Sequence, residues 1–225
     1  MAHIKVMASA AFREAYLELL PGFERASGHS VTNAWVPSVQ MMNRLKGGET
    51  SDLVILSDSA LADLMRAGIV AERFALAKSG IGVAVRAGAA RPDVSSAEAV
   101  KRAVLDAKSV VYSTGPSGIY LRALFERMGI AQQIASKVRQ VQGEPAGAVV
   151  ARGEAEIGFQ QMSELMPVEG IDIIGPLPPE IQEVTVFSAG LHGRAQEPAA
   201  ARALIACLTA PAAAAVIRKT GMEPA

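Results

Sequence analysis

The chain has 225 residues, half of them apolar, and its 22 basic residues balance 22 acidic ones. This balance argues against a broad charged face for nucleic acid or a membrane surface, so any charged partner must be held by local groups. No apolar run is long enough to cross a bilayer, which excludes direct insertion into a membrane.

Strand-like and helical segments alternate from the N-terminus onward. We predict strands at 3–8, 31–36 and 52–56, each followed by a segment with apolar residues spaced three and four apart. Pro21 lies inside the first helical pattern and predicts a kink or a separate last turn. Strand, helix, strand and helix with short joints indicate a parallel sheet covered on both faces.

The same alternation returns in the second half and predicts a second, similar lobe. Its strands are expected within 78–88, 108–113, 137–141 and 154–159, with a helix at about 144–152. A last strand at 183–191 and two Ala-rich helices after Pro198 and Pro211 complete the predicted order.

Hydroxyl and amide side chains stand where predicted strands give way to helices. In open parallel sheets ligands bind beyond the carboxyl ends of the strands, where helix N-termini direct unpaired N–H groups at the crevice. Such a place suits an anion. Each serine can alternatively serve only as a helix N-cap. The residues are Ser9, Ser38, Ser57, Ser117, Gln160 and Gln161.

The stretch "GPSG", residues 115–118, has the most small and turn-forming residues of any predicted change from strand to helix. Gly115 and Gly118 have no side chain to shield the backbone, Pro116 restricts the backbone before the helix, and Ser117 offers a hydroxyl donor at the start of the helix. The stretch lacks the lysine and spacing of a nucleotide-binding P-loop. We therefore expect it to receive the oxygen of a small anion.

Metal and redox chemistry have little support in the sequence. The histidines, His3, His29 and His192, show no metal-ligand spacing and are expected at the surface. The single cysteine, Cys207, lies in an apolar helical pattern that predicts burial, and it has no partner for a disulfide within the chain. We expect no metal and no cofactor.

Four stretches carry a family resemblance: "KVMASAAFREAY", "SDLVILSDSALADLM", "YSTGPSGIYLRALFERMGI" and "ARGEAEIGFQQMSEL". They resemble the type 2 periplasmic solute-binding proteins of the molybdate-binding kind, and more narrowly a subgroup that includes aconitate isomerase. The resemblance implies an α/β, two-lobed fold, each lobe a mixed, mostly parallel sheet flanked by helices. It implies lobe 1 at 1–78 plus 185–225, lobe 2 at 79–184, and a ligand cleft between them.

The resemblance also implies a ligand site. Ser9 and Ser38 match hydroxyl donors, with Ala10 beside the first, and Ser117 and Gly143 match backbone donors, with Gly118 beside Ser117. Gln161 stands where the family has a tyrosine. An amide both donates and accepts, which favours an organic acid over tetrahedral molybdate.

A cation would hold a carboxylate strongly, and Arg13 is the best candidate for it. Arg13 can alternatively be a solvated arginine on a helix face.

The subgroup raises the question of catalysis. Moving a double bond along aconitate needs a base that removes an allylic proton and an acid that returns one. The candidates at the strand ends are Glu144, Glu164 and Tyr112, and the residues alone do not choose among them.

Three roles remain open. The first is a receptor that captures a small anion, either an oxyanion or an organic polycarboxylate, for an ABC permease, with a hinge near 77–80 and 178–184. The second is an enzyme of the aconitate-isomerase kind. The third, an effector-sensing module, ranks last because no DNA-binding helix pair is present. We expect a periplasmic protein if a signal peptide was trimmed and a cytoplasmic one if the chain is complete as written.

Overall fold

The computed structural model describes all 225 residues, and the chain divides into two compact units. Unit 1 comprises residues 1–79 and 185–225, and unit 2 comprises residues 80–184. Each unit contains a sheet with helices on both faces, which confirms the predicted α/β class.

The sheet of unit 1 contains three parallel strands at one side. β1 (His3–Ala8) lies between β2 (Ser30–Trp35) and β3 (Leu53–Ser57) and runs parallel to both. β9 (Val184–His192) pairs antiparallel with β3, and the short β10 (Glu223–Pro224) pairs with the first part of β4 (Val70–Arg86).

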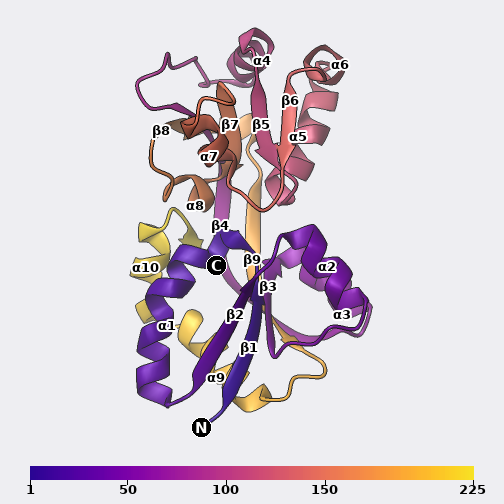
Figure 1. Cartoon of the computed structure of the whole chain (residues 1–225), viewed down its shortest axis with the longest axis vertical. Coiled ribbons are helices and arrows are strands. Elements are labelled where there is room, and N and C mark those ends of the chain that lie inside the picture. The colour runs from indigo at the N-terminus through magenta and orange to yellow at the C-terminus, as the bar shows by residue number, and fades with distance from the viewer. The chain divides into compact units, whose positions relative to one another are not determined.

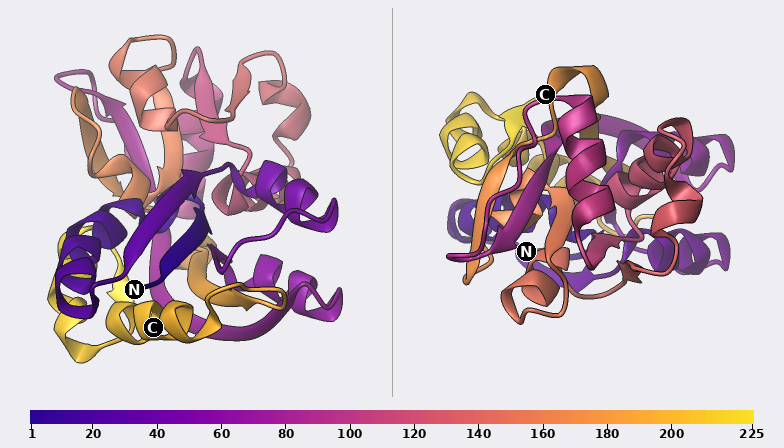
Figure 2. Two further views of the ribbon diagram at one scale, coloured as in Figure 1. Left: turned by 60° about the horizontal axis from the view of Figure 1, so that its bottom comes forward. Right: turned by 90° about the horizontal axis from the view of Figure 1, so that it is seen from above.

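Helices cover the two faces of this sheet with separate apolar cores (Figures 1 and 2). One face carries α1, α9 and α10, and the other carries α2 and α3. The bounds are η1 Ala10–Phe12, α1 Arg13–Ser27, α2 Ser38–Lys46, α3 Asp58–Arg66, α9 Pro198–Leu208, η3 Pro211–Ala213 and α10 Ala214–Lys219.

The first long helix shows how local sequence sets this packing. Tyr16, Leu20 and Phe23 repeat along one face of α1 and are buried, and Gly28 ends the helix in the left-handed conformation. The helix is not divided at Pro21, contrary to the alternative of a separate last turn. Pro21 is exposed, so water can solvate the carbonyl that its missing N–H leaves unpaired.

In unit 2 the second part of β4 has a partner at each edge. β7 (Ile157–Gln161) and β8 (Ile171–Pro176) both pair antiparallel with β4. β5 (Val110–Ser113) runs parallel to β7 and to β6 (Val138–Val141). β8 was not predicted from the sequence, because its mostly half-buried residues show no alternation between a buried and an exposed face.

Helices again cover both faces of the unit 2 sheet. The larger core lies under α4, α5 and α6, and a smaller one lies under α7. Figure 1 shows α5 and α7 at different sides of β5 and β7. The bounds are α4 Ala97–Asp106, α5 Pro116–Arg127, α6 Ala131–Ile134, α7 Ala146–Ala151, α8 Met162–Leu165 and η2 Pro179–Ile181.

Two side chains lie elsewhere than expected. His192 is the last residue of β9 and only 2% exposed, so its prediction as a surface loop residue is wrong. The strand extends one residue beyond the apolar residues from which its end was predicted. Cys207 is only partly buried, packed against the edge of the unit 1 core.

No single helix in the chain has the length and apolarity to span a bilayer. α9 and the η3–α10 segment meet those criteria only when joined across a 54° bend, and the buried side of both belongs to the unit 1 core.

Candidate functional site

The carboxyl ends of β1, β2 and β3 meet at one edge of the unit 1 sheet because the three strands are parallel. Two backbone bonds extend the alignment beyond the strands: Ser9 N–H donates to the Ile55 carbonyl and Val36 N–H donates to the Ala8 carbonyl, both at 3.0 Å. η1 with α1, α2 and α3 all begin at this edge. The structure therefore brings Ser9, Ala10 and Ser38 to neighbouring positions.

The Ser9 hydroxyl has no hydrogen-bond partner. Its residue is 5% exposed, and its Oγ is buried. A buried hydroxyl without a partner carries an unfavourable desolvation cost, which a ligand oxygen at this point would remove. Ser38 is half-buried at the first residue of α2, and Ser57 is buried just before α3.

Neither Ser9 nor Ser57 acts as a capping side chain, although both hold the N-cap position. The N-cap of α2 is Pro37, and no side chain caps that helix. The alternative that these serines serve only as helix caps is therefore not what the structure shows.

Arg13 lies at the same edge and stacks on an aromatic ring. Its guanidinium carbon is 5.5 Å from the centre of the Trp35 ring, and the residue is exposed without a carboxylate partner. The Trp35 ring in turn meets the ring of Tyr16 edge to face. Trp35 thus orients a free cation, a role that the sequence analysis missed; a tryptophan ending a half-polar strand was the available signal.

In unit 2 the loop after β5 is built around Ser113. Its Oγ accepts a hydrogen bond from the Gly115 N–H at 3.2 Å and lies 3.5 Å from the Oγ of Ser117, which is 1% exposed. A Cβ on Gly118 would lie 1.6 Å from the Ser113 carbonyl oxygen. Close internal packing by itself therefore requires glycine at 118.

The loop after β6 lies beside the loop after β5. Thr114 N–H donates to the Val141 carbonyl at 3.0 Å, and Gly143 follows with φ +84°, a conformation that favours glycine. Glu144 contacts two cations, Arg152 at 2.9 Å and Arg139 at 3.4 Å. Its carboxylate is thus committed to an ion-pair network at the surface.

Two glutamines end β7 and behave differently. Gln161 is fully buried. Gln160, 2% exposed, accepts a hydrogen bond at Oε1 from the Ala146 N–H at 2.7 Å and donates from Nε2 to Glu164 Oε1 at 2.9 Å. Burial raises the pKa of Glu164 to about 7, and the bond from Gln160 partly opposes the rise.

Tyr112 packs against the start of α5, where a Cβ added at Gly118 would lie 3.1 Å from its ring. It is 4% exposed in the core under α5, with its ring 6.0 Å from that of Phe125. Burial raises its pKa above the ordinary value for tyrosine, so the phenol stays protonated at neutral pH. The structure places Tyr112 in this apolar core beside Gly118, with its ring packed on Phe125 and not on a carboxylate candidate.

The chain contains no group of three or more His, Cys, Asp and Glu side chains arranged to hold a metal ion. Hydroxyl, amide and guanidinium groups, which suit an anion, stand at the strand ends instead, beside the carboxylates of Asp58 and Glu164.

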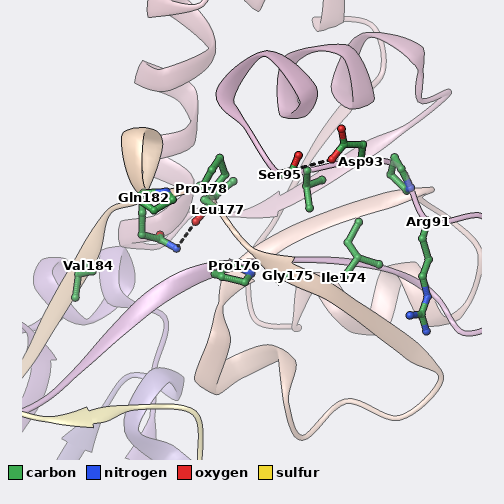
Figure 3. Close-up of a pocket in the computed structure, with 13 residues that line it drawn as sticks. Arg91, Asp93, Ser95, Ile174, Gly175, Pro176, Leu177, Pro178, Gln182 and Val184 are labelled. Carbon is green, nitrogen blue, oxygen red and sulfur yellow. Dashed lines mark hydrogen bonds between the residues drawn. The ribbon is translucent and has the colours of Figure 1, made fainter.

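A separate hollow of about 840 Å³ lies in unit 2 between the 91–95 segment and the chain from 174 onward (Figure 3). Its polar side chains are already engaged. The Asp93 carboxylate accepts from the Ser95 N–H at 2.9 Å, and the Gln182 amide binds the backbone of Ile81 and Leu177. The remaining lining is rich in proline and aliphatic side chains, so this hollow is not the anion site.

Solved structures place the chain in the fold class of the periplasmic binding proteins. The molybdate-binding protein of Azotobacter vinelandii matches with a TM-score of 0.80 at 18% identity, covering 97% of this chain and 98% of that one. The tungstate transporter protein of Geobacter sulfurreducens matches with a TM-score of 0.76 at 14% identity, covering 96% and 98%. These likenesses confirm the fold implied by the sequence resemblance.

Sequence comparison then gives the family. Residues 4–223 match the family described as bacterial extracellular solute-binding protein. An aconitate isomerase from a Pseudomonas species is 41% identical over 229 residues, covering 98% of this chain and 87% of that protein. The chain belongs to the bacterial extracellular solute-binding protein family.

Proposed function

We propose that this protein captures a small organic polycarboxylate, of the size and charge of aconitate, with the strand-end groups of both units. The buried, unpartnered hydroxyl of Ser9 is the observation that carries the proposal. It supplies a desolvated donor at an edge where three helices begin, and an anionic oxygen is the partner that such a donor favours.

Carboxylate is favoured over a tetrahedral oxyanion for two reasons. Arg13 is a cation without an ion-pair partner, and a guanidinium matches a carboxylate in shape. Position 161 carries a glutamine amide where the resemblance implies a tyrosine, and this change argues against a pocket built for a tetrahedral oxyanion.

In this proposal each unit acts as one lobe of the binding protein, residues 1–79 with 185–225 and residues 80–184. As a member of an extracellular solute-binding family, the protein would work in the periplasm and deliver its ligand to an ABC permease. Ala10, Ser38, Ser117, Gly118 and Gly143 would complete the lining.

Thermal unfolding with a panel of anions tests the ligand class. The panel contains citrate, cis-aconitate, trans-aconitate, molybdate, tungstate and sulfate. A ligand at about a hundred times its Kd stabilises the native state by about 2.7 kcal/mol, a clear shift in Tm. We expect shifts with the organic acids; a shift with molybdate or tungstate alone would overturn the carboxylate proposal.

A second candidate function is isomerisation of the bound tricarboxylate. Two observations favour it: the 41% identity to an aconitate isomerase, and a carboxyl group, Glu164, whose pKa of about 7 suits a base at neutral pH. Incubation of the protein with trans-aconitate, followed by proton NMR for cis-aconitate, decides this. No conversion above the uncatalysed rate would exclude the enzyme role and leave the binding role standing.

A further inference from the structure

The orientation of the Gln160 amide is fixed by its surroundings. The Ala146 N–H, 2.7 Å away, can only donate, so the amide atom facing it must be the oxygen. The opposite atom, Nε2, therefore faces Glu164. The side chain is 2% exposed, and a flip would set two donors against each other at Ala146.

This orientation distinguishes the two oxygens of Glu164. Nε2 of Gln160 can only donate, so Glu164 Oε1 accepts, and the carbonyl oxygen of the neutral acid is the better acceptor for this bond. The bond from Gln160 therefore favours the proton of the neutral acid on Oε2. No cation forms an ion pair with this carboxylate, in contrast to the two arginines on Glu144.

We propose that Glu164 is the proton-transfer group of the isomerisation and that Gln160 is its positioning residue, holding Oε1 so that Oε2 faces the reacting carbon. This inference rests on the second candidate function. The Oε2 carboxylate takes the allylic proton, and the C–H electron pair spreads over the conjugated carbons and carboxylate. The neutral acid then returns the proton to the other end of the allyl system, which restores the carboxylate.

The other two candidates do not meet these requirements. Glu144 is held by Arg139 and Arg152 at the protein surface. Tyr112 lies in the core under α5 and stays protonated at neutral pH. Glu164 alone combines a half-buried carboxyl, a raised pKa and one oxygen held by a buried amide.

The first test compares Glu164→Gln with the unmodified protein. The isosteric amide keeps an acceptor for Gln160 but cannot take a proton at carbon. We expect kcat to fall by about 10³-fold, while the Kd for trans-aconitate, measured by calorimetry, stays within about threefold. Glu169→Gln, an exposed glutamate in the same unit, is the matched control and should leave both quantities unchanged.

The second test uses the pH profile, which a merely structural role would not move. The acid limb of kcat/KM in the unmodified protein should lie near pH 7. Gln160→Glu keeps an acceptor for Ala146 but sets a second carboxylate against Glu164, so the limb should move up by about one pH unit or more while Kd changes little. If this variant does not fold, a carbon-13 NMR titration of Glu164 in the unmodified protein supplies the same pKa.

The outcomes separate the assignment from the function. A protein that binds trans-aconitate without converting it overturns the isomerase role and this inference together, and leaves the binding role intact. A protein that converts trans-aconitate, but whose Glu164→Gln variant keeps a tenth or more of its kcat, overturns only the assignment of Glu164. An unmoved acid limb in Gln160→Glu overturns the positioning role.

Discussion

The guanidinium of Arg13 lies over the ring of Trp35, 5.5 Å from its centre. Arg13 is the first residue of α1 and Trp35 is the last residue of β2, so the contact joins two elements at the strand-end edge of unit 1. The ring restricts the arginine without neutralising it, and the charge stays available for an anion.

We therefore expect Arg13→Leu to weaken binding of the organic acid about 10- to 100-fold, because a desolvated charge pair with the ligand is lost. Trp35→Phe keeps the charge and should cost less, about threefold to tenfold. Calorimetric titration measures both. Arg25→Leu, in the last turn of the same helix, is the control. Equal affinity in Arg13→Leu and Arg25→Leu would show that Arg13 is only a solvated surface residue.

Ser9→Ala should separate stability from binding. Removing a buried hydroxyl that has no partner should leave the free energy of unfolding unchanged or raise it by up to about 1 kcal/mol, while affinity falls about tenfold. Ser51 provides a matched control, since its Oγ is also buried without a partner but precedes β3. Ser51→Ala should have the same stability effect and no effect on affinity. A drop in affinity in both variants would argue for an indirect effect on the fold.

Gly118→Ala should destabilise unit 2 by about 3 kcal/mol or more, because the added methyl group would meet the backbone carbonyl of Ser113. At Gly115 an added Cβ would lie 3.4 Å from the Ser113 Oγ, an ordinary contact, so Gly115→Ala should cost less than about 1 kcal/mol. Urea denaturation of both variants measures the difference. Similar stabilities would mean that the loop relaxes easily and that packing does not require glycine at 118.

Glu164 should make stability depend on pH. Its pKa in the folded protein, about 7, lies above the ordinary 4.5, so the native state binds the proton more tightly than the unfolded chain does. The free energy of unfolding should therefore fall as the pH rises from about 4.5 to about 7, by about 3 kcal/mol in all.

Glu164→Gln should remove this pH dependence. The free energy of unfolding of the variant should therefore exceed that of the unmodified protein by about 3 kcal/mol at pH 8, and the two should be nearly equal at pH 4.5. Burial lowers the pKa of His192, which produces an opposite slope below its ordinary pKa of 6.5, but this contribution is common to both proteins and cancels. A stability difference that is the same at both pH values would contradict the raised pKa of Glu164.

Those parts of the site that depend only on the order of strands and helices along the chain could be predicted from the sequence. Ser9 and Ser38 follow apolar strands and precede helical patterns, so their place at a sheet edge could be derived from periodicity. The contact between Arg13 and Trp35 could not, since 22 residues separate them and only the β1–β2 register brings them together.

Other features depend on contacts that no local pattern encodes. β8 was missed because an edge strand with uniformly half-buried residues lacks alternation. His192 was misplaced because burial at the end of β9 depends on the loops that pack around it. Glu164 was one of three equal candidates, and its distinction depends on the Gln160 amide, whose orientation is set by a backbone N–H 14 residues earlier in the chain.

Calorimetric titration of the purified protein with trans-aconitate, beside molybdate and the Ser9→Ala/Ser38→Ala double variant, tests the central claim most directly. The account predicts binding of trans-aconitate at one site per chain, no comparable binding of molybdate, and an affinity at least about 100-fold weaker in the correctly folded double variant. Undiminished affinity in the double variant, or binding of molybdate but not of trans-aconitate, would contradict it.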